Sequence, residues 1–168
     1  MLLRPATLAD AASMLAIYAP IVRDTATSFE LEPPSLEEFT GRVRKVLDRW
    51  EWLVAEQEGE VVGYAYGSVH RERPAYQWAT ETSAYVTPAA RRLGVGRALY
   101  EALLPRLAER GYCNAYAGIA LPNDASIALH HAVGFTHIGL FPTVGWKFGK
   151  WHDVAWMHRR LRAAPPRA

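Results

Sequence analysis

The stretch that decides the fold covers residues 81–99 and reads Glu81-Thr-Ser-Ala-Tyr-Val-Thr-Pro-Ala-Ala-Arg-Arg-Leu-Gly-Val-Gly-Arg-Ala-Leu99. Residues 82–86 are rich in β-branched and aromatic side chains and predict a strand. Pro88 ends that strand, because proline cannot donate a hydrogen bond to a β-ladder. Apolar residues then recur at helical spacing, namely Ala98, Leu99, Ala102, Leu103 and Leu107. The stretch therefore predicts a strand, a glycine turn and the start of a helix.

The turn between this strand and this helix has the properties of a phosphate site. Gly94 and Gly96 leave the backbone unobstructed where a helix begins, and unpaired N–H groups and the helix dipole favour an anion there. Positive charge is added by Arg91, Arg92 and Arg97. A Walker loop is excluded because Arg97-Ala98 follows Gly96, and a dinucleotide fingerprint because Leu99 replaces its third Gly or Ala.

Length and composition are typical of one globular domain. Of 168 residues, 50% are hydrophobic, and we expect a domain over residues 1–162 with an unstructured tail at 163–168. A net charge of +2 is too small to favour nucleic acid or an anionic membrane. The single cysteine, Cys113, excludes an internal disulfide, and neither a signal peptide nor an apolar run of ~20 residues is visible. These features predict a cytoplasmic protein.

Helix and strand signals alternate in an α/β order. Strands are predicted at 2–4, 52–55, 61–69, 78–86, 114–120, 135–140 and 154–161, and helices beginning near 9, 35, 96 and 124. Ser35 and Glu38 form a capping box for the second helix, whose predicted inner face is Leu36, Phe39, Val43, Val46 and Leu47. The order predicts a mixed central sheet of about seven strands flanked by about four helices.

Several separated blocks resemble one superfamily. Residues 91–96 fit the pattern Arg/Gln-x-x-Gly-x-Gly/Ala of the GCN5-related N-acetyltransferases, the GNAT superfamily, and residues 3–10 resemble the start of many such enzymes. Their second motif is similar to Asn123-x-x-Ser126-x-x-Leu129-His130-x-x-x-Gly134-Phe135. Within the superfamily, three further blocks resemble the phosphinothricin and methionine sulfoximine/sulfone N-acetyltransferases. They are Ala75-Tyr76-x-Trp78-x-x-Glu81-x-Ser83-x-Tyr85-Val86, Leu121-Pro-Asn-Asp124 and Gly149-x-Trp151-His-Asp-Val154. The resemblance runs from Leu3 to about Arg160 and implies the GNAT fold.

The resemblance also implies acetyl-CoA as cosubstrate. It should enter where the strand ending at Val86 splays from the strand ending at Ala120. Backbone groups of Ala84, Tyr85 and Val86 would then hold the pantetheine arm like an added strand. The pyrophosphate is expected on the turn formed by Arg91, Arg92, Leu93, Gly94, Val95, Gly96 and Arg97. Asn123 and Ser126 would contact the cosubstrate from the far side of the cleft.

Attack of an amine on a thioester needs a base, because an α-amino group is largely protonated at neutral pH, and an acid for the leaving thiolate. Glu81 is the candidate base, since it lies in the cleft strand and its family counterpart has that role. The alternative is a solvated or ion-paired carboxylate. His130 stands where many GNAT enzymes carry a tyrosine as the acid, and could act as acid or base. The alternative is a helix histidine bonded to a carbonyl, and His131 is expected on the outer face.

Substrate contacts are implied for Phe29, Arg73, Pro74, Ala75, Tyr76, Glu81, Thr82, Ser83 and Lys147. Arg73 is the first choice for a substrate carboxylate, with Arg71 in the same loop, although a solvated arginine is the alternative. The aromatic residues Phe29, Tyr76 and Tyr85 either wall a pocket or belong to the core. Lys147 and Trp151 lie in a segment that reaches the site in this family, from a two-fold partner. No metal is expected, because His152-Asp153 lacks a suitably spaced third ligand.

These inferences predict direct acetyl transfer to the α-amine of phosphinothricin, methionine sulfoximine or methionine sulfone, because Cys113 shows no partner base for a covalent route. One alternative is a GNAT enzyme that acts on a polyamine or a protein N-terminus. A polyamine site should be acidic, and candidate acidic residues are Glu30, Glu32, Glu37 and Glu38. Another is a non-catalytic acetyl-CoA-binding module. A homodimer is implied by the family, and candidate interface aromatics are Trp146, Phe148 and Trp151.

Overall fold

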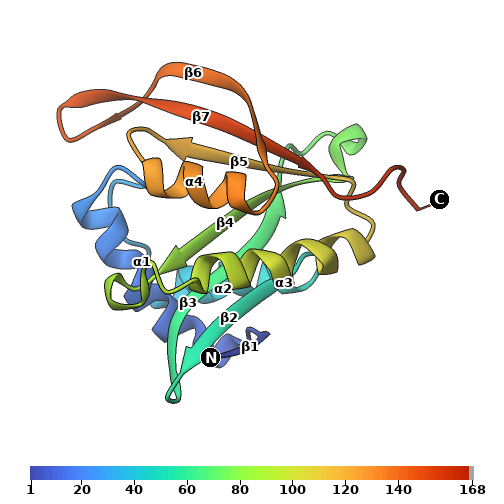
Figure 1. Ribbon diagram of the computed structural model, residues 1–168. Coiled ribbons are helices and arrows are strands. Elements are labelled where there is room, and N and C mark those ends of the chain that lie inside the picture. The colour runs from blue at the N-terminus through green and yellow to red at the C-terminus, as the bar shows by residue number, and fades with distance from the viewer. Residues whose placement is uncertain (167–168) are drawn as a thin grey trace.

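A seven-stranded mixed sheet runs through the structure, a computed structural model that describes residues 1–166 (Figure 1). Its order is β1-β2-β3-β4-β5-β7-β6, and every neighbouring pair is antiparallel except β4 and β5, which are parallel. The strands are β1 (Leu2–Pro5), β2 (Trp52–Gln57), β3 (Glu60–Val69), β4 (Ala79–Val86), β5 (Asn114–Ala120), β6 (Thr136–Lys147) and β7 (Lys150–Arg160). The predicted mixed sheet is confirmed.

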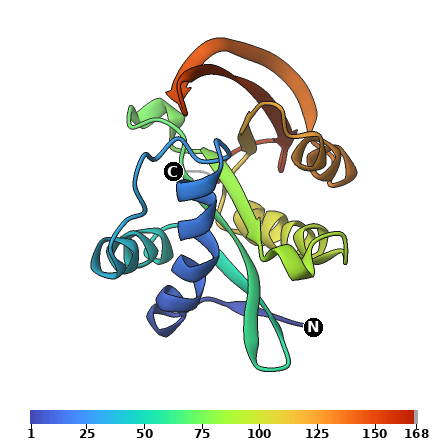
Figure 2. The same ribbon diagram turned by 90° about the vertical axis from the view of Figure 1, so that its left-hand side faces the viewer.

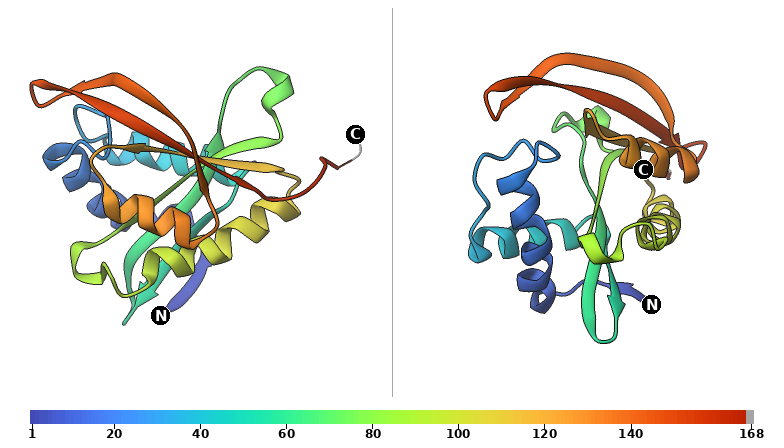
Figure 3. Two further views of the ribbon diagram at one scale, coloured as in Figure 1. Left: turned by 45° about the horizontal axis from the view of Figure 1, so that its top comes forward. Right: turned by 60° about the vertical axis from the view of Figure 1, so that its left-hand side comes forward.

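Helices cover both faces of this sheet, with α1 and α2 on one face and α3 and α4 on the other (Figures 2 and 3). Their bounds are α1 (Ala11–Asp24), α2 (Leu36–Leu47), α3 (Val95–Glu109) and α4 (Asp124–Ala132). None of the helices in the described part of the chain is long and apolar enough to cross a membrane. The core forms two clusters: one joins α1, α2 and α3 to β2 and β3 and so includes helices from both faces, and a second joins α3 and α4 to β5 and β7.

Local signals set the helix ends as predicted. Ser35 caps α2, accepting a hydrogen bond from the Glu38 backbone while the Glu38 carboxylate accepts one from the Ser35 backbone. The predicted inner face of α2 is wrong at one position, since Leu36 is 49% exposed. It occupies the first position of the helix, and the buried face begins one turn later, at Phe39.

The last two strands extend much further than predicted and form one long hairpin that arches over the rest of the molecule (Figure 2). The Gly-, Trp- and Lys-rich segment between the predicted strands is the distal half of this hairpin, and Phe148 and Gly149 turn it with positive φ. Pro142 interrupts the strand pattern in the sequence. The pairing register shifts between Phe141 and Gly145, and an edge strand tolerates proline at such an irregularity.

Residues 163–166 carry neither helix nor strand. The last two residues of the predicted unstructured tail, 167 and 168, lie outside the described residues.

Candidate active site

Strands β4 and β5 pair over only three residues and then separate. The parallel register joins residues 79–81 to residues 114–116, and no pairing continues beyond Glu81 and Tyr116 (Figure 1). The predicted splay is therefore confirmed. Between Thr82 and Val86, β4 keeps its hydrogen bonds to β3 on one edge, whereas the edge that faces β5 has no strand partner. Ala84, Tyr85 and Val86 lie on this open edge, which can accept an extended chain as an added strand.

Helices α3 and α4 both begin on the side where β4 and β5 diverge (Figure 1). Gly94 is the N-cap of α3 with φ +80°, and Arg92 also has a positive φ of 61°. The backbone N–H groups of its first turn, at Val95, Gly96 and Arg97, lack an intrahelical acceptor, as in any α-helix, and the N-cap Gly94 has no side chain to replace it. An anion at this turn would meet those donors and the positive end of the helix.

The predicted arginines of the turn are partly engaged. The guanidinium of Arg91 donates to the backbone oxygen of Val86 at 3.3 Å, at the end of β4. The guanidinium of Arg97 pairs with Glu101 at 2.7 Å on the outer face of α3. The side chains of Arg92 and Leu93 are exposed. The backbone of the turn, rather than these side chains, is therefore the better-placed donor set.

Asn123 and Ser126 meet at the first turn of α4. The side-chain oxygen of Asn123 accepts a hydrogen bond from the Ser126 backbone at 3.2 Å and caps the helix. Both residues are half-buried. Their proposed contact with the cosubstrate stays a prediction, and their local role is to fix the second helix N-terminus at the splay.

Glu81 is the last residue of β4 that pairs with β5. One carboxylate oxygen, Oε1, accepts hydrogen bonds from His70 Nδ1 at 3.0 Å and from Arg71 Nη1 at 3.2 Å. Among the described residues, Oε2 has no hydrogen-bond partner, and the side chain is 29% exposed. The ion-paired arrangement considered from the sequence is thus present, and it leaves one oxygen open to accept a proton from an amine.

Alternation along β4 separates Glu81 from one predicted neighbour. Glu81 and Ser83 lie on one face of the strand, whereas Thr82 faces the other, where it is buried beside the Tyr100 hydroxyl at 3.4 Å. The prediction that Thr82 shares a substrate site with Glu81 is therefore not supported. The ring of Tyr85 packs in the core between Tyr18 and Tyr64, at centroid distances of 5.1 and 5.4 Å, which favours the core interpretation of that side chain.

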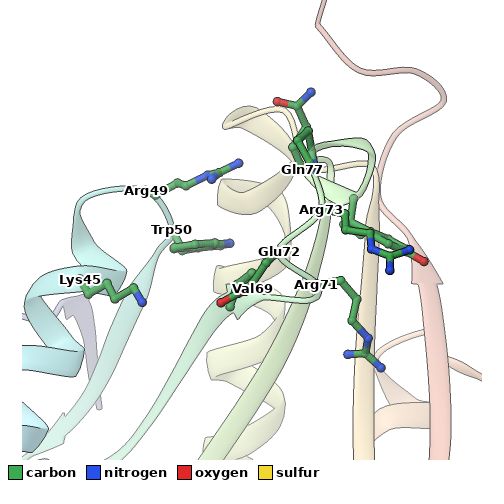
Figure 4. Close-up of a pocket in the computed structure, with 11 residues that line it drawn as sticks. Lys45, Arg49, Trp50, Val69, Arg71, Glu72, Arg73 and Gln77 are labelled. Carbon is green, nitrogen blue, oxygen red and sulfur yellow. The ribbon is translucent and has the colours of Figure 1, made fainter.

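The loop after β3 lines two cavities, and two of its residues, His70 and Arg71, contact Glu81. A cavity of about 530 Å³ is lined by Val69, His70, Arg71, Glu72, Arg73 and Tyr76. A neighbouring one of about 500 Å³ lies between this loop and the end of α2, with Lys45 and Arg49 on one side of it and Arg71 and Arg73 on the other (Figure 4). The lining is rich in cationic side chains, so the region favours an anionic group.

The two candidate arginines of this loop differ in their contacts. Both are exposed, and Arg71 contacts Glu81 at 3.2 Å, whereas the contact of Arg73 with a substrate carboxylate stays a prediction. Pro74, Ala75 and Tyr76 form a short 3₁₀ turn that is exposed to solvent. No sequence motif singles out His70, because its contact with Glu81 depends on where β3 ends relative to β4.

His130 is buried, and both ring nitrogens have partners. Nδ1 lies 2.7 Å from the Ser126 carbonyl oxygen, which can only accept, so Nδ1 carries a proton. Nε2 lies 2.9 Å from the hydroxyl of Tyr100, a residue of α3 that the sequence did not mark as functional. Burial lowers the pKa of His130 and raises the pKa of Tyr100, so a neutral imidazole accepts from the phenol. The carbonyl-bonded alternative is present, and His131 is exposed as expected.

Two further predicted substrate contacts serve the β6–β7 hairpin. Lys147 is 4% exposed, and its ammonium donates to the backbone oxygens of Val22 at 2.6 Å and Ser28 at 2.8 Å. This ammonium binds the end of α1 to the hairpin, and the predicted substrate contact is not supported. Phe29 lies so close to Gly145 that a Cβ there would stand 2.3 Å from the ring. Phe29 therefore packs on the hairpin, although 37% of it stays exposed.

His152 and Asp153 also have structural partners. His152 Nε2 lies 3.0 Å from the Lys147 backbone oxygen, and Asp153 accepts a hydrogen bond from the Thr143 backbone at 2.7 Å. Both contacts lie within the hairpin.

Comparison with known proteins agrees with this geometry. The family model described as the acetyltransferase (GNAT) domain matches residues 3–156. The chain is 40% identical over 166 residues to the phosphinothricin N-acetyltransferase of Streptomyces viridochromogenes, covering 98% of this chain and 91% of that protein. It is 36% identical over 169 residues to the L-methionine sulfoximine/L-methionine sulfone acetyltransferase of Salmonella typhimurium, covering 98% of each.

One similar solved structure contains the cosubstrate acetyl-CoA. The fold is similar to the crystal structure of a GNAT superfamily phosphinothricin acetyltransferase from Sinorhizobium meliloti in complex with acetyl-CoA. The TM-score is 0.94 at 37% identity, covering 98% of this chain and 92% of that one. The splayed strands and the two helix N-termini at the splay belong to a fold that binds acetyl-CoA in that relative. The chain therefore belongs to the GNAT acetyltransferase family and is an acetyl-CoA-dependent N-acetyltransferase.

Proposed function

We propose that this enzyme transfers the acetyl group directly from acetyl-CoA to the α-amine of a small amino acid, of the phosphinothricin, methionine sulfoximine or methionine sulfone type. The observation that carries the proposal is the Glu81 carboxylate, which has a free oxygen at the start of the splay and a cationic loop beside it. Relatives named for these three substrates support the choice. Residues 1–162 act as one catalytic domain in the cytoplasm.

In this proposal the cosubstrate occupies the splay. The pantetheine arm pairs with the open edge of β4 at residues 84–86, and the pyrophosphate accepts hydrogen bonds from the backbone of residues 92–97. Asn123 and Ser126 border the arm from the side of α4. The thioester then lies near Glu81, since this residue closes the narrow end of the splay.

An α-amino acid carries its two charges on one carbon, so its ammonium and carboxylate need partners that lie close together. Glu81 and Arg71, which touch at 3.2 Å, meet this requirement. The ammonium would approach the free Oε2, and the carboxylate would take hydrogen bonds from Arg71 and Arg73 in the 530 Å³ cavity. Tyr76, 44% exposed, borders the same cavity.

Glu81 Oε2 takes a proton from the ammonium, and the freed amine attacks the thioester carbon. The C–S bond of the tetrahedral intermediate then breaks, and the second proton of the attacking nitrogen passes to the departing sulfur, so that the amide and the CoA thiol are released. The hydroxyl of Tyr100 lies 3.4 Å from Thr82, the first β4 residue beyond the pairing with β5. Its one O–H donates to His130 Nε2 at rest and turns to the thiolate sulfur as that charge forms.

The test is thiol release from acetyl-CoA with a panel of amines. Methionine sulfone, methionine sulfoximine and phosphinothricin should be acetylated, and spermidine and a short peptide should not. Turnover confined to spermidine would overturn the substrate class. Two of the four acidic residues considered for a polyamine are already engaged, because Glu30 pairs with Arg42 and Glu38 caps α2.

The proposal includes a homodimer formed through the β6–β7 hairpin. Its distal aromatic residues are the most exposed large rings of the described chain, with Trp146 56%, Phe148 58% and Trp151 57% exposed. Such a cluster is uncommon on a monomer surface. Sedimentation of Trp146→Arg should show a monomer where the wild type shows a dimer, and a monomeric wild type would refute this part.

A further inference from the structure

His70, the first residue after β3, lies against the carboxylate of Glu81. Its Nδ1 stands 3.0 Å from Glu81 Oε1. A carboxylate oxygen can only accept, so the proton of this hydrogen bond belongs to Nδ1. The contact therefore fixes the imidazole tautomer as well as the position of one carboxylate oxygen.

Three aromatic rings hold His70 in this orientation. Its ring stacks on Tyr116 at a centroid distance of 4.7 Å and an interplanar angle of 19°. Tyr76 and Trp156 meet it edge-on, at 5.7 Å and 72° and at 6.4 Å and 81°. Because its side chain is only 14% exposed, His70 is a rigid, mostly buried donor rather than a mobile surface histidine.

The second partner of Glu81 Oε1 is Arg71, which is exposed where His70 is mostly buried. Arg71 is 48% exposed, and its long side chain also donates to the His70 backbone oxygen at 2.7 Å. Exposed ion pairs contribute little because water and side-chain entropy compete with them. Arg71 can therefore leave Glu81 for a substrate carboxylate, whereas His70 cannot follow it. These two residues are the titratable groups that contact the carboxylate.

We propose that His70 is a positioning residue for the acetyl transfer. Its Nδ1–H holds Oε1 of Glu81, and Oε2 is thereby turned toward the amine while Arg71 binds the substrate. The inference rests on the proposed role of Glu81 as the base. Without His70, the carboxylate would keep only its exposed partner and would rotate away from the geometry that proton transfer needs.

A matched pair of substitutions separates the hydrogen bond from the ring. His70→Phe keeps an aromatic ring for stacking but removes the donor. His70→Asn keeps an N–H donor at the branch where Nδ1 stands but removes the ring. We expect His70→Phe to lower kcat on the order of 100-fold with unchanged affinity for acetyl-CoA, and His70→Asn to recover most of that loss.

The control is His158→Asn. His158 packs near Tyr116 at 5.0 Å, in the same aromatic cluster, but hydrogen-bonds to Asn114 instead of Glu81. It should keep the wild-type kcat. Wild-type kcat in His70→Phe would overturn the proposal, and so would equal losses in His70→Phe and His70→Asn.

A readout that needs no turnover keeps the proposal separate from the proposed function. Long-range ¹H–¹⁵N spectra of the imidazoles should show His70 protonated at Nδ1 in the wild type and shifted toward the Nε2–H form in Glu81→Ala. A wild-type His70 protonated only at Nε2 would overturn the proposal. Absence of turnover with every amine, together with the Nδ1–H form, would instead refute the proposed function and leave the hydrogen bond standing.

Discussion

Replacing Lys147 with methionine should destabilise the protein without harming substrate binding. Methionine keeps the apolar stem but removes the ammonium, which donates to the carbonyls of Val22 and Ser28. Lys147 is 4% exposed, so water has little access to the two carbonyls left behind. A buried polar group without a partner costs about 1–3 kcal/mol, which gives a loss of about 2–4 kcal/mol for the pair after partial relaxation.

Urea unfolding measures this loss directly. With a slope of about 2 kcal/mol per M, the midpoint should fall by roughly 1–2 M. Lys150→Met is the matched control, because Lys150 lies in the same hairpin and is exposed; it should change stability by less than about 0.5 kcal/mol. An unchanged midpoint in Lys147→Met, together with a raised KM for the amino acid, would refute the structural role and restore the predicted substrate contact.

Three other perturbations have expected outcomes. Arg71→Gln should raise KM for the amino acid at least about 10-fold in steady-state assays, because a charge-assisted hydrogen bond is lost; an unchanged KM would contradict that role. The hydrogen bond from Arg4 lowers the pKa of Asp10, so its stabilisation is present at neutral pH and is lost as pH falls below about 4. Between pH 7 and pH 3, the free energy of unfolding should therefore depend less on pH in Arg4→Met than in the wild type. The same pH dependence in both proteins would contradict this role of the Arg4–Asp10 pair. Gly94→Ala should cost about 1–2 kcal/mol in urea unfolding, because φ is +80° there, and should weaken acetyl-CoA binding in calorimetry; wild-type values of both would argue against the need for glycine at this turn.

Local chemistry made most of the fold predictable from the sequence. The capping box at Ser35 and Glu38 fixed the start of α2, and Gly111 and Gly134, both with positive φ, follow the ends of α3 and α4. The apolar face of α3 was likewise readable from its spacing, and Leu99 is buried as expected. Each of these features depends on residues a few positions apart.

Contacts between distant segments were not predictable in this way. The ammonium of Lys147 bonds to Val22, 125 residues away, and no local pattern indicates that a lysine in this Gly-, Trp- and Lys-rich segment is buried. His70 and Glu81 meet because β3 and β4 pair in one particular register. The location of the splay came from the family resemblance, since the point at which two strands separate has no signature in either strand alone.

The central claim is that Glu81 accepts the proton when an amino acid takes the acetyl group. Wild type and Glu81→Gln should be compared with methionine sulfone and ¹³C-acetyl-CoA, measuring kcat, the site of the label and the affinity for acetyl-CoA. The account predicts label on the α-nitrogen in the wild type and a loss of about 100-fold or more in kcat for Glu81→Gln, with acetyl-CoA affinity unchanged. Wild-type kcat in Glu81→Gln, or label on any other atom, would contradict it.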